Sequence, residues 1–381
     1  MLRIMSLDAK TYSSEMVTQF FPDLTKDTED ILYVYAGPVG SFMEKSCLMI
    51  ATRIRNSVNS HTKILFDNML EGEVEPTLHK IYNILSLLEI NRDNVYYLTS
   101  AFDANYYHNI YCKKYNISNK IHIYVSNAWE WLLTSSSSSK SRTNIIKIKN
   151  KNFLCFNRML RPQRLALATM LESKQLIDGS FYSLFSELYD QENVLDKIIT
   201  QLKSSINDEE VFNKILFGSR TLRKRLPLTL TINDHNQNVT YIIDEDIRLF
   251  DDSYFSVVTE TNFFPYNDHN NLEKFANEFF SEKTYKPIIM KHPFVLLAPS
   301  NSLSNLKRIG YKTFSPWIDE SYDNEKDHTK RLVKVVNEIE RLCKQTPEQW
   351  INWQKGIAEI VEYNYSVLIN RKITDYAIER H

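Results

Sequence analysis

The sequence predicts an α/β protein with two domains, each built on a parallel β-sheet. Three observations predict this class. The chain has 381 residues, which is too long for one ordinary domain and suits two. Short apolar runs alternate with segments of helical spacing, as they do where helices connect parallel strands. A serine-rich segment at residues 134–141 interrupts the alternation, as a flexible loop between two domains would.

Four apolar runs near the N-terminus have the length and composition of buried strands. They are residues 31–36, 63–67, 94–99 and 120–125. Segments with apolar residues at helical spacing separate them, at residues 42–58, 76–89 and 104–115. This order predicts a parallel, doubly wound sheet, and we place the domain boundary near residue 145.

The second half begins a new alternation. Strands are expected at residues 152–156, 254–259, 294–298 and 311–314. Helices are expected at residues 161–173, 271–280, 281–289 and 303–309, with Gly310 at a C-cap position. Residues 180–250 give no clear pattern, and the chain after residue 323 is helical nearly to its end. We therefore expect domains at residues 1–145 and 146–330, followed by C-terminal helices at 331–381.

The composition excludes several classes of protein. Glycine occurs only 7 times and never in GxGxxG or GxxxxGK[ST] spacing, which disfavours a glycine-rich phosphate loop and a dinucleotide oxidoreductase. The 46 Lys and Arg balance the 47 Asp and Glu, so there is no global attraction to nucleic acid or to a membrane surface. The 4 cysteines form no CxxC pair, which fits a reducing cytosol. No signal peptide or membrane span is expected.

The strongest candidate for a ligand site is the segment FFSEKTYKP at residues 279–287. Ser281 is a good N-cap, which places Glu282 and Lys283 in the first turn of a helix. The N–H groups of a helix N-terminus suit a diphosphate, and a lysine there neutralises phosphate. A carboxylate at this position can accept from both hydroxyls of a ribose. The alternative is a capped surface helix with an ordinary Glu–Lys pair.

A second candidate is the segment NFLCFNRMLRPQR at residues 152–164, where a strand leads into a helix. Arg158, Arg161 and Arg164 follow the strand at a spacing of three and are expected at its carboxyl end, where open α/β sheets bind ligands. Guanidinium groups match the geometry of phosphate. Glu260 follows another strand of the same domain and is a further candidate. The alternatives are a solvated helix face and, for Glu260, an exposed loop acid.

These segments resemble the donor-binding half of the alpha-1,3-fucosyltransferase family. In that family a Tyr-Val-Thr-Glu-Lys segment precedes a helix and a Val-Pro-Val-Val strand; here SEKTYKPI at residues 281–288 precedes HPFV at 292–295. The strand–loop–helix at 152–164 is similar to the family's arginine-bearing element. The region also resembles fucosyltransferase-like glycosyltransferases of tailed phages and large viruses, which share such segments and one in the style of WIDESYD at residues 317–323. The resemblance covers roughly residues 150–330.

The resemblance implies the GT-B fold, which has two Rossmann-like domains with a cleft between them. By position, Glu282 would hold the ribose of a nucleotide-diphosphate sugar and Lys283 its phosphate, and Arg158 or Arg164 would lie on the diphosphate. Phe279 replaces the tyrosine of the family, so the donor is not fixed as GDP-fucose. A GT-B enzyme needs no metal and no cofactor besides this co-substrate, because cationic side chains and a helix end replace the charge of a metal ion.

Two further sets of acidic residues are candidates for chemistry. Asp244 and Asp246 spell the DxD pattern that holds Mg²⁺ or Mn²⁺ in the other glycosyltransferase fold, but their neighbours favour an acidic surface loop. An inverting transfer needs a general base, which comes from the first domain in GT-B enzymes. The carboxylates that follow predicted strands there are Asp67, Glu71, Glu73 and Asp103. Glu71 is preferred, and Asp67 is the second choice.

A basic cluster at residues 219–225 (SRTLRKR) stands out in this neutral chain. It contains Arg220, Arg223, Lys224 and Arg225. Together with Lys147, Lys149 and Lys151 it is a candidate contact for a polyanionic acceptor such as DNA. The alternative is a solubilising helix end or loop.

We therefore interpret the chain as a cytoplasmic glycosyltransferase that uses a nucleotide-diphosphate sugar and a hydroxyl acceptor. Arg158, Arg164, Lys283 and a helix N-terminus would stabilise the leaving group. Hydroxymethylated viral DNA is one candidate acceptor, and a glycan, a lipid-linked sugar or a protein is the other. The alternative from another class is a non-catalytic module with a degenerate GT-B fold that binds a nucleotide or a nucleic acid.

Overall fold

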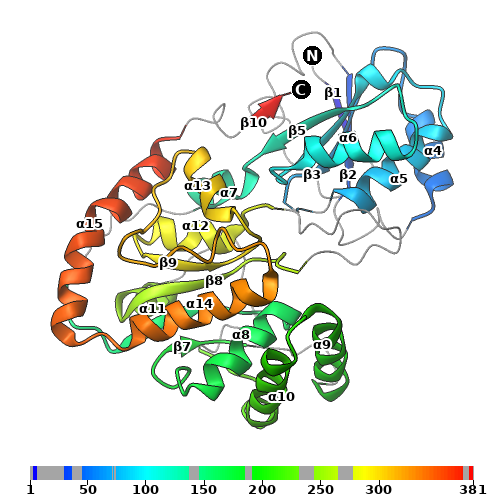
Figure 1. The fold of residues 1–381 in the computed structure, drawn as a ribbon. Helices are drawn as coiled ribbons and strands as arrows, with labels where there is room; N and C mark the ends of the chain where they lie inside the picture. Colours follow the sequence, from blue (N-terminus) through cyan, green and yellow to red (C-terminus); the bar gives the residue numbers. More distant parts are fainter. Residues whose placement is uncertain are drawn as a thin grey trace. The chain divides into compact units, whose positions relative to one another are not determined.

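The chain divides into two compact units, shown as a ribbon in Figure 1. The computed structural model describes residues 3–6, 30–36, 45–70, 72, 74–136, 146–184, 191–230, 244–264, 278–371 and 377–380. The N-terminal unit contains Met1–Trp131, Asn277–Ser281 and Arg371–His381, and the second unit contains Leu132–Ala276 and Glu282–Asn370. Each unit is built on a sheet of mainly parallel strands, as the sequence predicts.

The sheet of the N-terminal unit has the strand order β1-β2-β3-β4-β5-β10. Its strands are β1 (Arg3–Ser6), β2 (Asp30–Tyr35), β3 (Lys63–Asn68), β4 (Val95–Thr99), β5 (His122–Ser126) and β10 (Ala377–Arg380). Strands β1 to β5 are parallel, and β10 runs antiparallel to β5. The four strands expected from apolar runs are confirmed, whereas the short strands at the two ends of the order were not predicted.

Three of the described helices cover the same face of this sheet. They are α4 (Cys47–Arg55), α5 (Glu75–Ser86) and α6 (Ala104–Lys114). Their buried apolar residues join one core with Leu32, Val34 and the corresponding side chains of β3 to β5. On the opposite face, Ile31 and Tyr33 share a smaller core with Ala128 of α7 (Ala128–Ser136).

The strand order in this sheet follows the chain order, so each right-handed crossover runs in the same direction and its helix lands on the same face. The parallel strands are therefore confirmed, and described helices lie on both faces of this sheet, although α4, α5 and α6 share one face and α7 covers the other.

The sheet of the second unit has the order β7-β6-β8-β9 and is entirely parallel. Its strands are β6 (Lys151–Cys155), β7 (Phe181–Tyr182), β8 (Ser253–Thr259) and β9 (Phe294–Leu297). The chain leaves β6 through α8 (Pro162–Ser173) toward β7 on one side. It leaves β8, on the other side of β6, through α12 (Glu282–Ile289) toward β9.

These two crossovers run in opposite directions, which places α8 and α12 on opposite faces of the sheet. This unit has the doubly wound topology. Its switch point lies between the carboxyl ends of β6 and β8, where α/β proteins of this topology bind ligands.

Further helices complete the second unit (Figure 1). They are α9 (Gln191–Ser205), α10 (Glu209–Arg223), α11 (Asp244–Asp251), α13 (Ser302–Arg308), α14 (His328–Cys343) and α15 (Pro347–Asn370). Helix α10 packs on α8, α14 contacts β9 and α8, and α15 packs on α12. The C-terminal helices are confirmed, and the region at residues 180–250 that gave no clear pattern contributes β7, α9, α10 and α11.

Two expected elements differ in the structure. Residues 311–314 form no strand, because the side chain of Asn364 binds their backbone: Oδ1 accepts from Lys312 N at 2.8 Å and Nδ2 donates to Lys312 O at 2.8 Å. Of the helix expected at 271–280, residues 278–280 are not helical, and the rest lies outside the described residues. In the N-terminal unit, Glu278 O accepts from Phe102 N at 2.8 Å.

We predict that Gly218→Ala lowers the free energy of unfolding by about 1–3 kcal/mol, because overpacking has this cost. A Cβ at Gly218 of α10 would lie 2.3 Å from the backbone oxygen of Thr169 in α8, so the two helices would have to separate. Asn213→Ala, at an exposed position of α10, is the control and should be neutral or stabilising. Urea unfolding measures both variants, and a Gly218→Ala protein as stable as wild type would contradict the close approach of the helices.

Candidate functional site

A group of polar side chains of the second unit lies at the switch point of its sheet. Asn157 and Arg158 follow β6, Glu260 follows β8, and Arg164 lies in the first turn of α8. The first turn of α12 contributes Glu282 and the two residues after it. Three of the sequence-predicted residues are thereby brought together, because the charges of Glu260 and Glu282 both act on the guanidinium of Arg164.

Hydrogen bonds of Asn157 join the carboxyl ends of three strands. Its Oδ1 accepts from Thr259 Oγ1 of β8 at 2.5 Å, and its backbone N donates to Ser183 Oγ after β7 at 3.1 Å. Its Nδ2 lies 3.1 Å from Cys155 Sγ at the end of β6. Sequence reasoning missed Asn157, although a polar residue two positions after a buried strand was a signal for it.

The loop after β8 is held from both faces of the sheet. Gln163 of α8 donates through Nε2 to the backbone oxygens of Glu260 at 2.9 Å and Thr261 at 2.8 Å. From α12, Thr284 Oγ1 donates to Glu260 Oε1 at 2.6 Å. Glu260 is only 1% exposed, so it is a buried, hydrogen-bonded carboxylate and not the exposed loop acid considered as the alternative.

Arg164 is a buried cation at this switch point, with 3% of its surface exposed. Its Nη1 donates to Met159 O at 2.9 Å and its Nη2 to Thr259 O at 3.5 Å, while its buried Nε has no hydrogen-bond partner among the described residues. Burial, assisted by the charge of Arg161, lowers the pKa of Arg164 to about 10 against the opposing effect of Glu282 and Glu260. Arg164 therefore remains positively charged at neutral pH.

Helix α12 begins at Glu282, so Ser281 directly precedes its first residue, as predicted. Glu282 is buried, and its Oε1 accepts from Lys283 Nζ at 2.8 Å. Burial acts to raise the pKa of Glu282, but the charges of Lys283 and Lys286 outweigh it and hold this pKa below its usual value. The pair thus combines a buried carboxylate with a half-buried ammonium, unlike an ordinary surface pair.

The arginines at positions 158, 161 and 164 differ in their surroundings. Arg161 is the N-cap residue of α8, and Arg158 lies in the loop before it. Both are exposed and have no ion-pair partner in the part of the chain that the structure describes. Only Arg164 is inside the helix that begins at Pro162, which explains why it alone is buried.

The WIDESYD segment supports the neighbouring helix α13. The carboxylate of Asp323 accepts from Leu303 N at 2.9 Å and Ser304 N at 3.2 Å, so it occupies the N-terminus of that helix. Tyr322 OH accepts from Leu296 N of β9 at 3.2 Å. These contacts give the segment a structural role, because they hold it against β9 and α13.

The DxD pattern lies at the start of α11, because Asp244 and Asp246 are residues of that helix and not of the expected surface loop. The helix buries Phe250 next to β8, which fixes this segment as helical. Among the side chains that the structure describes, no group of three His, Cys, Asp or Glu residues is placed to hold a metal ion.

Of the two preferred candidate bases, Glu71 and Asp67, Asp67 is the one whose surroundings the structure describes. It lies in β3 of the N-terminal unit, where Met69 N donates to its Oδ1 at 2.8 Å and Tyr33 OH donates to its Oδ2. Burial raises the pKa of Asp67 to about 7, and the hydrogen bond from Met69 limits the rise. Glu71 and Glu73 lie outside the described residues, and Asp103 is the N-cap residue of α6.

The basic cluster at 219–225 is not a uniform positive patch. Arg223 pairs with Asp196, and Arg225 pairs with Glu172 at 2.6 Å and with Asp178. Arg220 and Lys224 are exposed and form no ion pair within the described residues. The three lysines considered with this cluster have local partners: Lys147 pairs with Asp252 at 3.2 Å, Lys149 Nζ donates to Ser253 O at 2.7 Å, and Lys151 Nζ donates to Asp178 O at 2.8 Å.

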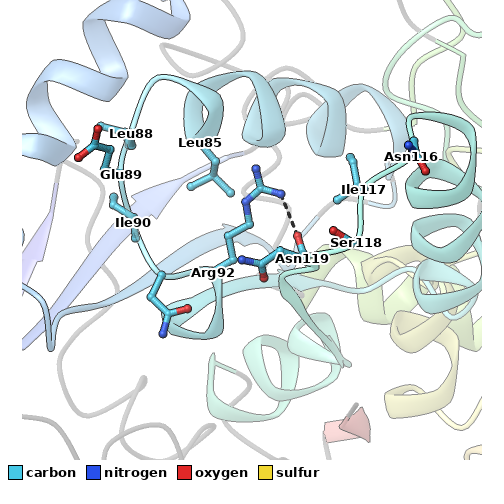
Figure 2. Close-up of a pocket in the computed structure, with 10 residues that line it drawn as sticks. Leu85, Leu88, Glu89, Ile90, Arg92, Asn116, Ile117, Ser118 and Asn119 are labelled. Carbon is cyan, nitrogen blue, oxygen red and sulfur yellow. Dashed lines mark hydrogen bonds between the residues drawn. The ribbon is translucent and has the colours of Figure 1, made fainter.

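The described residues of the N-terminal unit line two of its cavities at the amino ends of its strands. One, shown in Figure 2, has a volume of about 580 Å³ and lies beside Arg92, which donates through Nη1 to Asn119 O at 2.8 Å. The other has a volume of about 750 Å³, and Arg55, Leu88 and Asn94 are among the residues that line it. Ligands of open α/β sheets bind at the opposite, carboxyl edge, so neither cavity is the expected catalytic site.

The described residues contain no helix that is long and apolar enough to cross a membrane.

No protein-family model matches the sequence, and no curated protein matches it. Among solved structures, a UDP-forming alpha,alpha-trehalose-phosphate synthase from Burkholderia xenovorans is similar over 93% of this chain and 75% of its own, with a TM-score of 0.44 and 10% identity. A TarM mutant from S. aureus in complex with fondaparinux, alpha-GlcNAc-glycerol and UDP is similar over 92% and 58%, with a TM-score of 0.36 and 9% identity. An alpha,alpha-trehalose 6-phosphate synthase from Burkholderia multivorans is similar over 92% and 70%, with a TM-score of 0.40 and 10% identity. The two Rossmann-like units agree with the GT-B fold class that the sequence predicts.

We predict that replacing Asp67 by Asn removes a pH-dependent loss of stability. Because the pKa of Asp67 is raised to about 7 in the folded state, the folded state keeps a proton that the unfolded state loses near pH 4. The neutral carboxyl therefore contributes up to about 4 kcal/mol to the free energy of unfolding. This contribution is complete below pH 4 and is lost as the pH rises through 7. The difference in unfolding free energy between Asp67→Asn and wild type should thus shift in favour of the variant from pH 4.5 to pH 8.

Urea unfolding at several pH values provides the measurement. Asp93→Asn, at an exposed position of the same unit, is the control and should follow the wild-type profile. Parallel profiles for wild type and Asp67→Asn would show that Asp67 ionises normally.

Proposed function

We propose that the protein is a glycosyltransferase that moves a sugar from a nucleotide-diphosphate sugar to a hydroxyl acceptor. The observation that carries this proposal is the buried Arg164, which lies with Glu260 and Glu282 at the switch point of the second sheet. A departing nucleoside diphosphate gains negative charge, and a cation that is already fixed in place stabilises it without reorganisation. The buried carboxylates and backbone contacts of Arg164 provide this fixation.

The remaining donor contacts follow from exposure and charge. Arg158, Arg161 and Lys283 are the cations of this edge that solvent or a ligand can reach, and we assign them to the diphosphate together with the N-terminus of α12. Glu282 is assigned to the ribose hydroxyls, because its lowered pKa keeps it an ionised acceptor. Glu260 is assigned to positioning, since Thr284 Oγ1 donates to its Oε1 at 2.6 Å and Thr261 N to its Oε2 at 3.3 Å, which hold it in the loop after β8.

We propose Asp67 as the general base, with Tyr33 as the residue that orients its carboxylate. A base works best when its pKa lies near the operating pH, and the pKa of Asp67 is about 7. In the proposed step Asp67 takes the proton of the acceptor hydroxyl while that oxygen forms a bond to the anomeric carbon. The bond from this carbon to the diphosphate breaks, and the nucleoside diphosphate leaves with the electron pair. Glu71 remains a second candidate for this role.

The acceptor is proposed at the level of a hydroxyl compound, with hydroxymethylated DNA and a glycan as the two candidates. The rival function, a non-catalytic nucleotide-binding module, shares the donor site but not the chemistry. Release of free sugar from a nucleotide sugar by the purified protein would separate the enzyme from this rival.

We predict that Lys283→Ala and Glu282→Gln each weaken donor binding about tenfold, the loss expected for one charge-assisted contact of about 1.4 kcal/mol. A thermal-shift screen of nucleoside diphosphates and nucleotide sugars first identifies the ligand, because a bound ligand raises the melting temperature. Calorimetry with this ligand then compares the variants. Lys307→Ala, at an exposed position of α13 in the same unit, removes the same charge and should leave the affinity unchanged. Wild-type affinity in both site variants would remove this site from the proposal.

We also predict that transfer or donor hydrolysis survives EDTA, because Arg164 and the accessible cations supply the positive charge that a metal ion would otherwise supply. The measurement compares initial rates before and after chelation, with Mn²⁺ added back in excess. A loss of activity that Mn²⁺ restores would instead make Asp244 and Asp246 candidate metal ligands.

A further inference from the structure

We propose that the exposed face of α10 is a docking surface for single-stranded nucleic acid. The surface consists of Phe217, Arg220, Thr221 and Lys224, and we call it the α10 face. The first three lie in the helix, and Lys224 is its C-cap residue with helical backbone angles. The inference extends the proposed function, since it names the class of macromolecule that the protein would meet, but the binding can be measured without any sugar donor.

Helical geometry places these residues together. They occupy positions i, i+3, i+4 and i+7, which form one stripe on an α-helix. The opposite side of α10 packs on α8 through buried residues, and these are Val211, Ile215, Gly218, Ser219 and Leu222. The stripe itself is exposed, and the ring of Phe217 is 66% exposed.

The ion pairs around α10 single out two cations. Arg223 and Arg225 are neutralised by acids of their own unit, and Lys214 Nζ contacts Glu210 Oε1 at 2.7 Å. Arg220 and Lys224 have no ion-pair partner among the residues that the structure describes. The two cations of this basic cluster that remain available are therefore Arg220 and Lys224. Both lie on the same stripe as the exposed ring of Phe217.

An exposed aromatic ring with two available cations matches the chemistry of a single strand. Bases of a single strand can stack on an aromatic side chain, and its phosphates bind Lys and Arg. In a duplex the base faces are occupied by neighbouring bases, so the ring of Phe217 would gain nothing there. The favourable interaction of cations with a helix C-terminus explains Arg220 and Lys224. It does not explain why an exposed aromatic ring lies one turn before Arg220 on the same face.

The test measures binding of a fluorescent 20-nucleotide single strand of DNA by anisotropy, at several salt concentrations and without donor. Wild type should bind with an affinity that falls as salt rises. Arg220→Ala/Lys224→Ala should weaken binding at low salt at least tenfold and reduce the slope of log K against log salt by about 1.4, because each phosphate contact to a single strand contributes about 0.7.

Two further variants separate stacking from charge. Phe217→Leu keeps an apolar side chain but loses the ring, so it should weaken binding about tenfold at an unchanged salt slope. Lys214→Ala/Arg223→Ala removes two cations that already have acidic partners, on the same helix, and should change the affinity less than twofold. Thermal melting of each variant verifies that its fold is intact.

Several results would overturn the proposal. Absence of binding by wild type would reject the docking surface, and equal losses in the two double variants would reject the distinction between available and paired cations. An unaltered affinity of Phe217→Leu, or equal binding of a duplex and a single strand, would reject the single-strand assignment. Donor binding is measured separately by calorimetry, so a failure here leaves the proposed glycosyl transfer standing, and a failure there leaves this surface standing.

Discussion

The buried guanidinium of Arg164 is the constraint on which the arrangement of the second unit depends. Removing a cation from water costs several kcal/mol unless negative groups and hydrogen-bond acceptors surround it. Here the acceptors are the backbone oxygens of Met159 and Thr259, and the negative groups are Glu260 and Glu282. Both carboxylates are supplied by the crossover from β8 through α12 to β9, whereas Arg164 comes from the crossover that leaves β6 through α8. The topology of the sheet therefore brings the buried cation and the carboxylates that stabilise it to the same switch point.

The apolar runs made much of the fold predictable from sequence. A buried strand needs a continuous apolar stretch, and four such stretches in the first half and three in the second became β2 to β5, β6, β8 and β9. Strands β1, β7 and β10 escaped prediction because two to four residues carry too little pattern. The strand expected at 311–314 is absent because the backbone there binds the side chain of Asn364. This residue lies 52 positions from Lys312, so the local pattern does not reveal the contact.

The candidate site shows the same division. Arg164, Glu260 and Glu282 were identifiable because strand ends and helix starts are visible in the sequence. The sequence did not reveal which of three equally spaced arginines is buried, because this depends on where α8 begins. It also did not reveal that Arg223 and Arg225 are neutralised, since their partners Asp196, Glu172 and Asp178 come from other elements of the chain. Charge patterns along a sequence report neither burial nor pairing.

The pairing of β10 with β5 has a consequence for how the protein forms. Strand β5 is at the edge of the parallel array until residues 377–380 add to it, and the ion pair between Arg371 Nε and the buried Glu130 Oε1, at 3.0 Å, strengthens the return of the chain to this unit. During synthesis β5 therefore remains an unpaired edge strand until the whole second unit has emerged from the ribosome. An open edge can recruit other strands, so chaperones that shield such edges should matter most in this interval.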